Sequence, residues 1–252
     1  MDEEIFLSKS FDDGIDTKEF RSYLLDEFKK AQENIPCGHF LPDALYMADY
    51  ILRYKNTDGA MVEFGCYAGG MTAKLSHLAH HLNKKYYVFD SFCGLLESAE
   101  YETYDQKYSH LGKFQKGQFA STLENTKSYV SKYGKIDSCI FVPGIIEVNI
   151  EKFEENIMFG FIDVDLIPTA KQIIKKIWNQ VVSMGLFTHE ACIKDYMKEI
   201  LNSNFWMQNF KCKPPACLSD FVKKPKRMHG LSMAGCLDFL IKQNDVTTKG
   251  DL

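Results

Sequence analysis

The sequence lacks the features of a membrane, secreted or nucleic-acid-binding protein. It contains no apolar run of the roughly 20 residues that a membrane-spanning helix needs. Its first residues, MDEEIFLSKSFDD, do not follow the charged and then apolar layout of a signal peptide. The net charge of -4 provides no basic field for a nucleic-acid backbone. We therefore expect a cytoplasmic protein that binds neither membranes nor nucleic acids.

The cysteine pattern does not indicate a metal site. None of the 8 cysteines forms a CxxC pair, and Cys212 and Cys217, separated by KPPA, have no second pair to match them. Zinc sites normally require such matched pairs. Because no export signal is recognised, we predict free thiols that pack as small hydrophobic side chains.

What the sequence does contain is a rhythm of short apolar runs separated by amphipathic stretches. The chain of 252 residues, 45% of them hydrophobic, is long enough for one α/β domain. Near-continuous apolar strands between helices predict a doubly wound, mostly parallel sheet with helices on both faces. We expect a single domain over residues 1–252, with an N-terminal helical cap at 1–57 and a Rossmann-like core at 58–245. A polar insertion at 91–136 follows a strand and is predicted to cover the substrate.

The first segment that carries chemistry is Met61–Gly70, in which an apolar strand ends in an acid and a glycine-rich turn. Parallel sheets bind ligands at this end of their strands. A nicotinamide enzyme needs GxGxxG here to bind diphosphate, whereas the turn reads ExGxxxGG. An acid at this place repels diphosphate and accepts a hydrogen bond from an ammonium group. This favours S-adenosylmethionine, which carries an ammonium group and no phosphate.

The second segment ends the next strand with Asp90. This residue follows Glu63 at nearly the spacing at which an acid in a Rossmann-like unit meets ribose hydroxyls. The two oxygens of one carboxylate can accept from both hydroxyls. The alternative is that Asp90 only caps a helix or a turn.

Two further strands end in ionisable side chains. Asp163 and Asp165 lie on one face if the strand continues through them, but Asp165 could instead cap the following helix. The other strand ends in His189 and Glu190. Histidine is the side chain best suited to proton transfer near neutral pH, although a single histidine is more often structural. In a parallel sheet all these strand ends converge on one edge.

Taken together, these segments resemble the macrocin O-methyltransferase family of sugar-modifying enzymes. The resemblance runs over about residues 60–195 and rests on VEFGCYAGG, DSFCGLLES, DVDLIPTAKQ and MGLFTHEA, of which DSFCGLLE is the most specific. It implies a seven-stranded methyltransferase sheet, S-adenosylmethionine as methyl donor and a small hydroxylated acceptor, commonly a sugar in an antibiotic or a surface glycan.

The resemblance also implies roles for individual residues. The methionine end of the donor is expected at Glu63, Gly65 and Gly69, its ribose at Asp90 and Ser91, and the reacting centre at Asp163. The full set predicted to bind the donor is Glu63, Gly65, Tyr67, Gly69, Gly70, Thr72, Asp90, Ser91, Phe92 and Asp163.

The chain departs from the family pattern at the expected metal site. Members usually end the fourth segment in two acids, and here Glu190 matches the first and Ala191 the second, while Ile167 replaces an expected tyrosine. A magnesium ion relies on hard oxygen ligands. Either Asp163, His189 and Glu190 rebuild a Mg²⁺ site, or the enzyme works without a metal and His189 is the general base, with Asp163 beside it.

The predicted reaction is therefore O-methylation of a small polar molecule, with Asp163 and His189 as catalytic residues and residues 97–120 closing over the acceptor. Three alternatives stay open: N-methylation or methylation of a phosphate-like acceptor, a non-catalytic S-adenosylmethionine-binding module, and a nicotinamide-dependent oxidoreductase. Lys107, Lys113 and Lys116 would suit an anionic acceptor. The aromatic N-terminal helix is expected to pack on its own sheet or on a second subunit in a homodimer.

Overall fold

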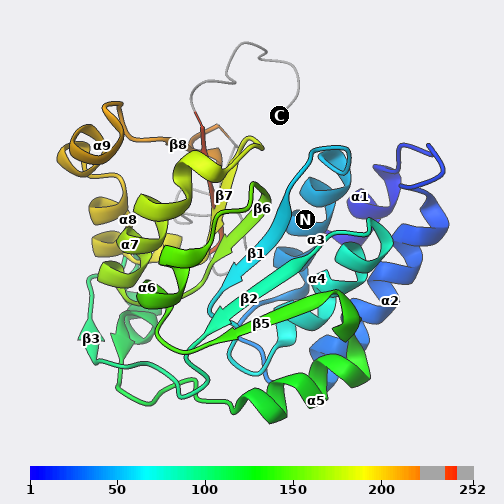
Figure 1. The fold of residues 1–252 in the computed structure, drawn as a ribbon, viewed down its shortest axis with the longest axis horizontal. Coiled ribbons are helices and arrows are strands. Elements are labelled where there is room, and N and C mark those ends of the chain that lie inside the picture. Colours follow the sequence, from blue (N-terminus) through cyan, green and yellow to red (C-terminus); the bar gives the residue numbers. More distant parts are fainter. Residues whose placement is uncertain (222–235, 243–252) are drawn as a thin grey trace.

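The computed structural model describes residues 1–221 and 236–242, so residues 222–235 and 243–245 of the predicted core lie outside the described residues. A seven-stranded sheet in the order β5-β2-β1-β6-β7-β9-β8 forms its centre (Figure 1). The first five strands in this order are parallel to one another, and β9 is antiparallel to both of its neighbours. This confirms the predicted α/β fold. The strands are β1 (Ala60–Phe64), β2 (Tyr86–Asp90), β5 (Cys139–Pro143), β6 (Ile157–Ile162), β7 (Gly185–Thr188), β8 (Ala216–Cys217) and β9 (Asp238–Ile241).

One face of the sheet is covered by the five helices that precede β5 in the chain. Their bounds are α1 (Glu3–Ser8), α2 (Lys18–Asn34), α3 (Leu41–Arg53), α4 (Gly70–His81) and α5 (Leu123–Tyr133). Leu24 and Phe28 of α2 pack in one cluster with Phe159 and Phe161 of β6. The N-terminal cap therefore packs on its own sheet, which was one of the two expected arrangements. The homodimer stays a prediction.

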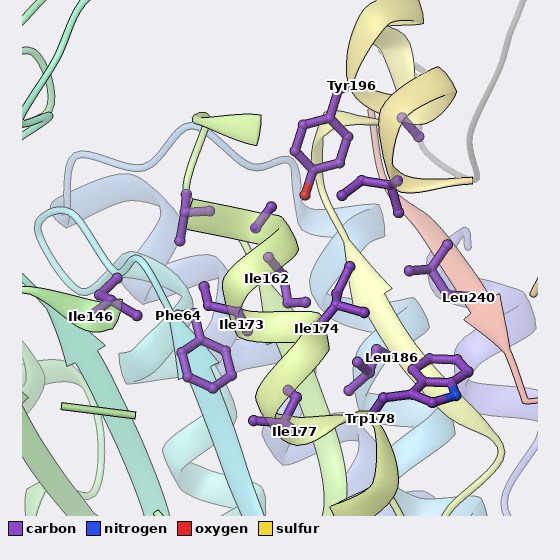
Figure 2. Close-up of a cluster of buried hydrophobic side chains, with 14 of the residues drawn as sticks. Phe64, Ile146, Ile162, Ile173, Ile174, Ile177, Trp178, Leu186, Tyr196 and Leu240 are labelled. Carbon is purple, nitrogen blue, oxygen red and sulfur yellow. The ribbon is translucent and has the colours of Figure 1, made fainter. Parts of the chain in front are cut away.

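The opposite face is covered by α6 (Ile146–Asn149), α7 (Ile167–Ile177), α8 (Lys194–Ile200) and α9 (Ser203–Phe210). Figure 2 shows Ile173, Ile174 and Ile177 of α7 in one cluster with Phe64 of β1 and Leu186 of β7, and Trp178 beside Leu186. The three isoleucines are fully buried, and their spacing of one, three and four residues places them on one face of the helix. Burying such a side chain contributes about 1.5–3 kcal/mol.

The alternation along β1 decides which side chains face which layer. Val62 and Phe64 belong to the cluster around α7, whereas Met61 belongs to the cluster beneath α3 and α4. Successive side chains of a strand point to opposite faces. Glu63 therefore points into the layer of α4, where it meets Thr72.

The predicted insertion at 91–136 contains two different parts. A short antiparallel pair, β3 (Ala99–Glu100) and β4 (Lys113–Phe114), encloses a 3-10 turn. The rest is largely α5, a regular helix whose first turn is capped by the Thr122 side chain and whose Val130 is fully buried. Only the first part has the irregular character expected of a lid. The 3-10 turns are η1 (Gln106–Gly112), η2 (Ile136–Ser138), η3 (Ile150–Lys152), η4 (Trp178–Gln180), η5 (Glu190–Cys192) and η6 (Leu218–Asp220).

The prediction that all cysteines are free thiols is wrong for two of them. Cys192 and Cys236 form a disulfide that joins η5 to the segment entering β9. The two residues are 44 positions apart, so the sequence offers no local signal for the pairing. Cys212 and Cys217 are not bonded to each other. Among the described helices, none is both long and apolar enough to cross a membrane.

Candidate functional site

A cavity of about 410 Å³ lies at the carboxyl ends of the parallel strands. Small-molecule sites in proteins are typically about 300–1,000 Å³. Its wall combines the ends of β1, β2 and β6 with the connection between α2 and α3. Of the residues predicted from sequence, it includes Gly65, Tyr67, Gly70, Asp90, Ser91, Asp163 and His189.

The glycine turn after β1 brings the ends of β1 and β6 into contact. Gly65 has a φ of +84°, and a Cβ atom added to it would lie 1.9 Å from the carbonyl oxygen of Asp163. Only glycine adopts this conformation readily and permits this approach. Gly70 opens α4, and a Cβ there would lie 2.7 Å from the Cβ of Cys37. The glycines therefore leave room for the cavity wall to close around the turn.

Asp90 ties the ends of β1 and β2 together. Its Oδ2 accepts hydrogen bonds from the backbone N–H groups of Cys66 at 2.7 Å and Tyr67 at 3.2 Å, and Oδ1 accepts from Phe92 at 2.7 Å. Ser91 similarly holds its own turn, donating to the carbonyl of Gly94 at 2.9 Å. Both residues line the cavity. Asp90 thus acts as a turn residue, and its role at a ribose stays a prediction.

Glu63 lies behind the cavity wall. Its Oε2 accepts from the hydroxyl of Thr72 at 2.6 Å and from that of Tyr86 at 2.8 Å. The side chain is fully buried, and burial raises the pKa of its carboxyl to about 8. A protonated acid of this kind supports the turn from beneath. Direct contact with the donor, predicted for Glu63 and for Gly69, Thr72 and Phe92, has no support in this geometry, since none of the four lines the cavity.

Asp163 stands between two imidazoles at the centre of the wall. Its Oδ2 lies 2.8 Å from Nε2 of His39, and its Oδ1 lies 3.2 Å from Nδ1 of His189. The same Nδ1 is 3.4 Å from Oε1 of Glu190. The two imidazole rings meet edge to face with centroids 4.3 Å apart. A carboxylate held from both sides in this way has a fixed orientation.

The charges in this cluster depend on one another. Burial disfavours the ionised form of Asp163, but His39 and His189 outweigh it and hold the pKa of that carboxyl well below its ordinary value. Burial also opposes a charge on His189, and the neighbouring Asp163 overcomes this and raises the pKa of the imidazole well above its ordinary value. Burial raises the pKa of Glu190 to about 7. Asp163 is therefore the ionised member, and His189 balances its charge.

Asp165 does not share a strand face with Asp163. β6 ends at Ile162, and Asp165 adopts a left-handed conformation with a φ of +59°. Burial, followed by the nearby Glu190 and Asp163, raises the pKa of the Asp165 carboxyl well above its ordinary value. Asp165 also does not cap the following helix through its side chain, because α7 begins after Leu166 without a side-chain cap.

The residues at this position do not fit a magnesium ion. Ligand atoms of Asp163, His189 and Glu190 lie within 4.8 Å of one another. Mg²⁺, however, demands hard oxygen ligands in near-octahedral geometry. Here an imidazole nitrogen stands between the two carboxylates, His39 occupies the second oxygen of Asp163, and Ala191 replaces the remaining acid. The arrangement therefore does not support a metal-dependent step.

His39 is the site residue that sequence reasoning missed. It lies in the connection PCGHFLP, far from the strand ends, and is only 7% exposed. Its separation of 124 residues from Asp163 leaves no periodic signal. The one hint is that a histidine stands between two prolines in a segment that must pass close to the sheet edge.

Comparison with known proteins supports the fold. No family profile and no curated protein matches the chain. The O-methyltransferase NovP is similar in structure over 96% of this chain and 99% of its own, with a TM-score of 0.63 and 12% identity. CalS11, a calicheamicin methyltransferase, covers 88% of this chain and 92% of its own, with a TM-score of 0.56 and 15% identity. At these identities the likeness shows the architecture, and the macrocin-type resemblance stays a prediction. The chain has the fold of these two methyltransferases.

Proposed function

We propose that the protein is an S-adenosylmethionine-dependent methyltransferase that methylates a hydroxyl of a small polar molecule such as a sugar. The observation that carries this proposal is the His189–Asp163 pair on the wall of a cavity at the strand ends. A base oriented by a carboxylate is the arrangement that activates a hydroxyl nucleophile. The fold shared with two methyltransferases supports the choice of reaction.

The charge of the cavity suits S-adenosylmethionine, which carries a sulfonium and an ammonium group. Among the described residues, the lining includes the carboxyl side chains of Asp90, Glu97, Glu147, Asp163 and Asp165 and no lysine or arginine. Carboxylates favour a cationic ligand, whereas a dinucleotide diphosphate would be repelled. This disfavours the nicotinamide alternative. The glycine turn and the start of α4 are the places where the amino-acid end of the donor fits, and Asp90 is within the same wall for the ribose.

When bound, the donor supplies an activated methyl group for direct displacement by the acceptor oxygen. The chain's own part is to orient the acceptor and to take its proton. Asp163 binds Nδ1 of His189, so Nε2 is the nitrogen that, once it has lost its own proton, accepts the proton of the acceptor hydroxyl. Positioning of the two reactants supplies much of the remaining rate.

The rim of the cavity suits a small acceptor with both polar and apolar surfaces. Leu96, Phe119 and Ile145 expose 40–50% of their surface around it. Thr169 and Glu147, which are hydrogen-bonded to each other, provide polar groups on the same wall. A sugar ring has this mixture of apolar faces and hydroxyl edges. Lys107, Lys113 and Lys116 are not among the lining residues, so they give no support to a phosphate-like acceptor.

Calorimetric titration of S-adenosylhomocysteine into EDTA-treated protein tests the donor. We expect micromolar binding, roughly -8 kcal/mol. Asp90→Asn should weaken it about tenfold, which corresponds to about 1.4 kcal/mol. Asp105→Asn is the matched control, because Asp105 also accepts a backbone N–H but lies outside the cavity.

The outcomes separate the alternatives. Binding by the wild type and the control, with a loss in Asp90→Asn, justifies a screen of hydroxylated acceptors. Binding without turnover of any acceptor in a broad panel would favour a non-catalytic binding module. No binding by the wild type would refute the proposal.

A further inference from the structure

His39 connects the N-terminal cap to the reacting centre. Its Nε2 donates to Asp163 at 2.8 Å, its ring contacts His189 edge to face, and it also contacts Phe161 of β6, with ring centroids 5.4 Å apart. Since a carboxylate can only accept, the proton of this bond belongs to His39. His39 lines the same cavity as Asp163.

Asp43, in the first turn of α3, lies behind His39. It is fully buried, and its Oδ2 accepts from the backbone N–H of Phe40 at 2.9 Å. Within the part of the chain that the structure describes, its Oδ1 and Nδ1 of His39 are both buried without a hydrogen-bond partner. Ligand atoms of His39, Asp43 and His189 lie within 4.8 Å of one another. Buried polar atoms in such a position normally have a partner, and a bridging water or a small rotation would join these two.

The five side chains form an alternating row of acids and imidazoles: Asp43, His39, Asp163, His189 and Glu190. The first two come from the N-terminal cap and the last three from the strand ends. A lone buried carboxylate at Asp163 would be costly without a cationic or hydrogen-bonding partner. The row provides one on each of its two oxygens.

From this row we propose that His39, supported by Asp43, is a positioning residue that fixes Asp163 and through it His189, and that it takes the Asp163 oxygen that a divalent metal would need. The inference rests on the proposed function, because it assigns His39 a part in that reaction. The inference extends the proposed function, because it makes the methyl transfer independent of a metal and dependent on the N-terminal cap.

A positioning role of His39 can be distinguished from a packing role, because His39 acts through one specific atom, Nε2. In His39→Gln the amide nitrogen can still donate to Asp163, but the imidazole ring and its contact with His189 are lost. His77→Gln is the matched control. His77 is also a buried histidine (3% exposed) that bonds to another helix, through Tyr23, and it does not line the cavity.

Two measurements need no acceptor. The first is proton NMR of the downfield imidazole N–H signals in the wild type and both variants. We expect His39→Gln to remove the His39 signal and shift that of His189, and His77→Gln to leave both unchanged. The second is titration with Mn²⁺ followed by electron paramagnetic resonance. We expect the EDTA-treated wild type to leave the signal of free Mn²⁺ undiminished.

A third measurement uses the acceptor identified by screening. His39→Gln should lower kcat about a hundredfold, the scale expected when a catalytic group is misplaced, with KM and S-adenosylhomocysteine affinity changed less than threefold. Added Mg²⁺ should not alter wild-type turnover. An unmoved His189 signal in His39→Gln, tight Mn²⁺ binding at the site, or unchanged kcat would each overturn the inference. Failure of the wild type to bind S-adenosylhomocysteine would instead refute the proposed function, while the NMR result would still decide whether His39 orients His189.

Discussion

The two halves of the sheet edge use their acids differently. At the ends of β1 and β2, Glu63 and Asp90 bind hydroxyl and backbone N–H groups of their own neighbourhood. At the ends of β6 and β7, Asp163 and Glu190 face imidazoles. The first pair shapes the turn on which the donor is expected to lie, and in the proposed reaction the second pair controls a proton. Residues of one type at equivalent strand ends therefore serve different purposes, because their partners differ.

The largest effect is expected from removing the charge on the β6 side. Asp163→Asn leaves the shape intact but loses the anion that orients His189, and we expect kcat to fall about 10⁴-fold. Binding of S-adenosylhomocysteine should weaken about tenfold at most. Steady-state turnover together with calorimetry checks this. If binding and turnover fell by the same factor, Asp163 would have a structural role like that of Glu63 and Asp90. The difference between the two halves of the sheet edge would then not hold.

His189→Gln should have the next largest effect. It removes the proposed base while keeping a polar side chain, so kcat should fall about 10²–10⁴-fold with donor affinity unchanged. The double variant with Asp163→Asn should lose little more than Asp163→Asn alone, because the two residues act as a unit. Additive losses in the double variant would show that the pair does not work together.

Glu63→Gln tests the structural role of the acids at the ends of β1 and β2 through the pH dependence of stability. The pKa of Glu63 rises from its ordinary 4.5 to about 8 in the folded protein. The folded state therefore keeps a proton that the unfolded state releases, so the free energy of unfolding declines as pH rises from about 4.5 to about 8 and is level above that. The total decline is on the order of 5 kcal/mol.

The neutral glutamine should remove this decline, so that the variant gains stability over the wild type as pH increases. Thermal unfolding from pH 5 to pH 9 measures it, and exposed Glu151→Gln provides the control. A constant difference between Glu63→Gln and the wild type across this range would mean that Glu63 is ionised in the folded protein, as expected for a direct contact with an ammonium group.

The smallest effect is expected in the insertion. Lys113 is 62% exposed and pairs with Glu100 at 3.4 Å, so Lys113→Gln should change stability by less than about 0.5 kcal/mol. Turnover should stay within about twofold of wild type, because Lys113 does not line the cavity. A large loss of turnover would revive an anionic acceptor and would assign the insertion a direct part in substrate binding.

The fold and half of the site could be predicted from local pattern. The apolar runs and the acids that end them located β1, β2, β6 and β7, and parallel strands necessarily bring those ends to one edge. The orientation of Glu63 was also within reach, because alternation along a five-residue strand separates it from Phe64. Asp163 and Asp165 could not be separated in this way, because the strand ends at Ile162 and the alternation ends with it.

By itself, the sequence determined the order of strands and helices, the glycine turn at Gly65 and the gathering of ionisable groups at one edge, since these depend on periodicity and on backbone preferences that act over a few residues. Tertiary structure alone decided that His39 reaches Asp163 from a distant connection and that Cys192 meets Cys236. Hydrogen bonds and disulfides depend on distances in space. These two contacts join segments that come together only when the N-terminal cap and β9 pack on the sheet, so no short-range pattern encodes them.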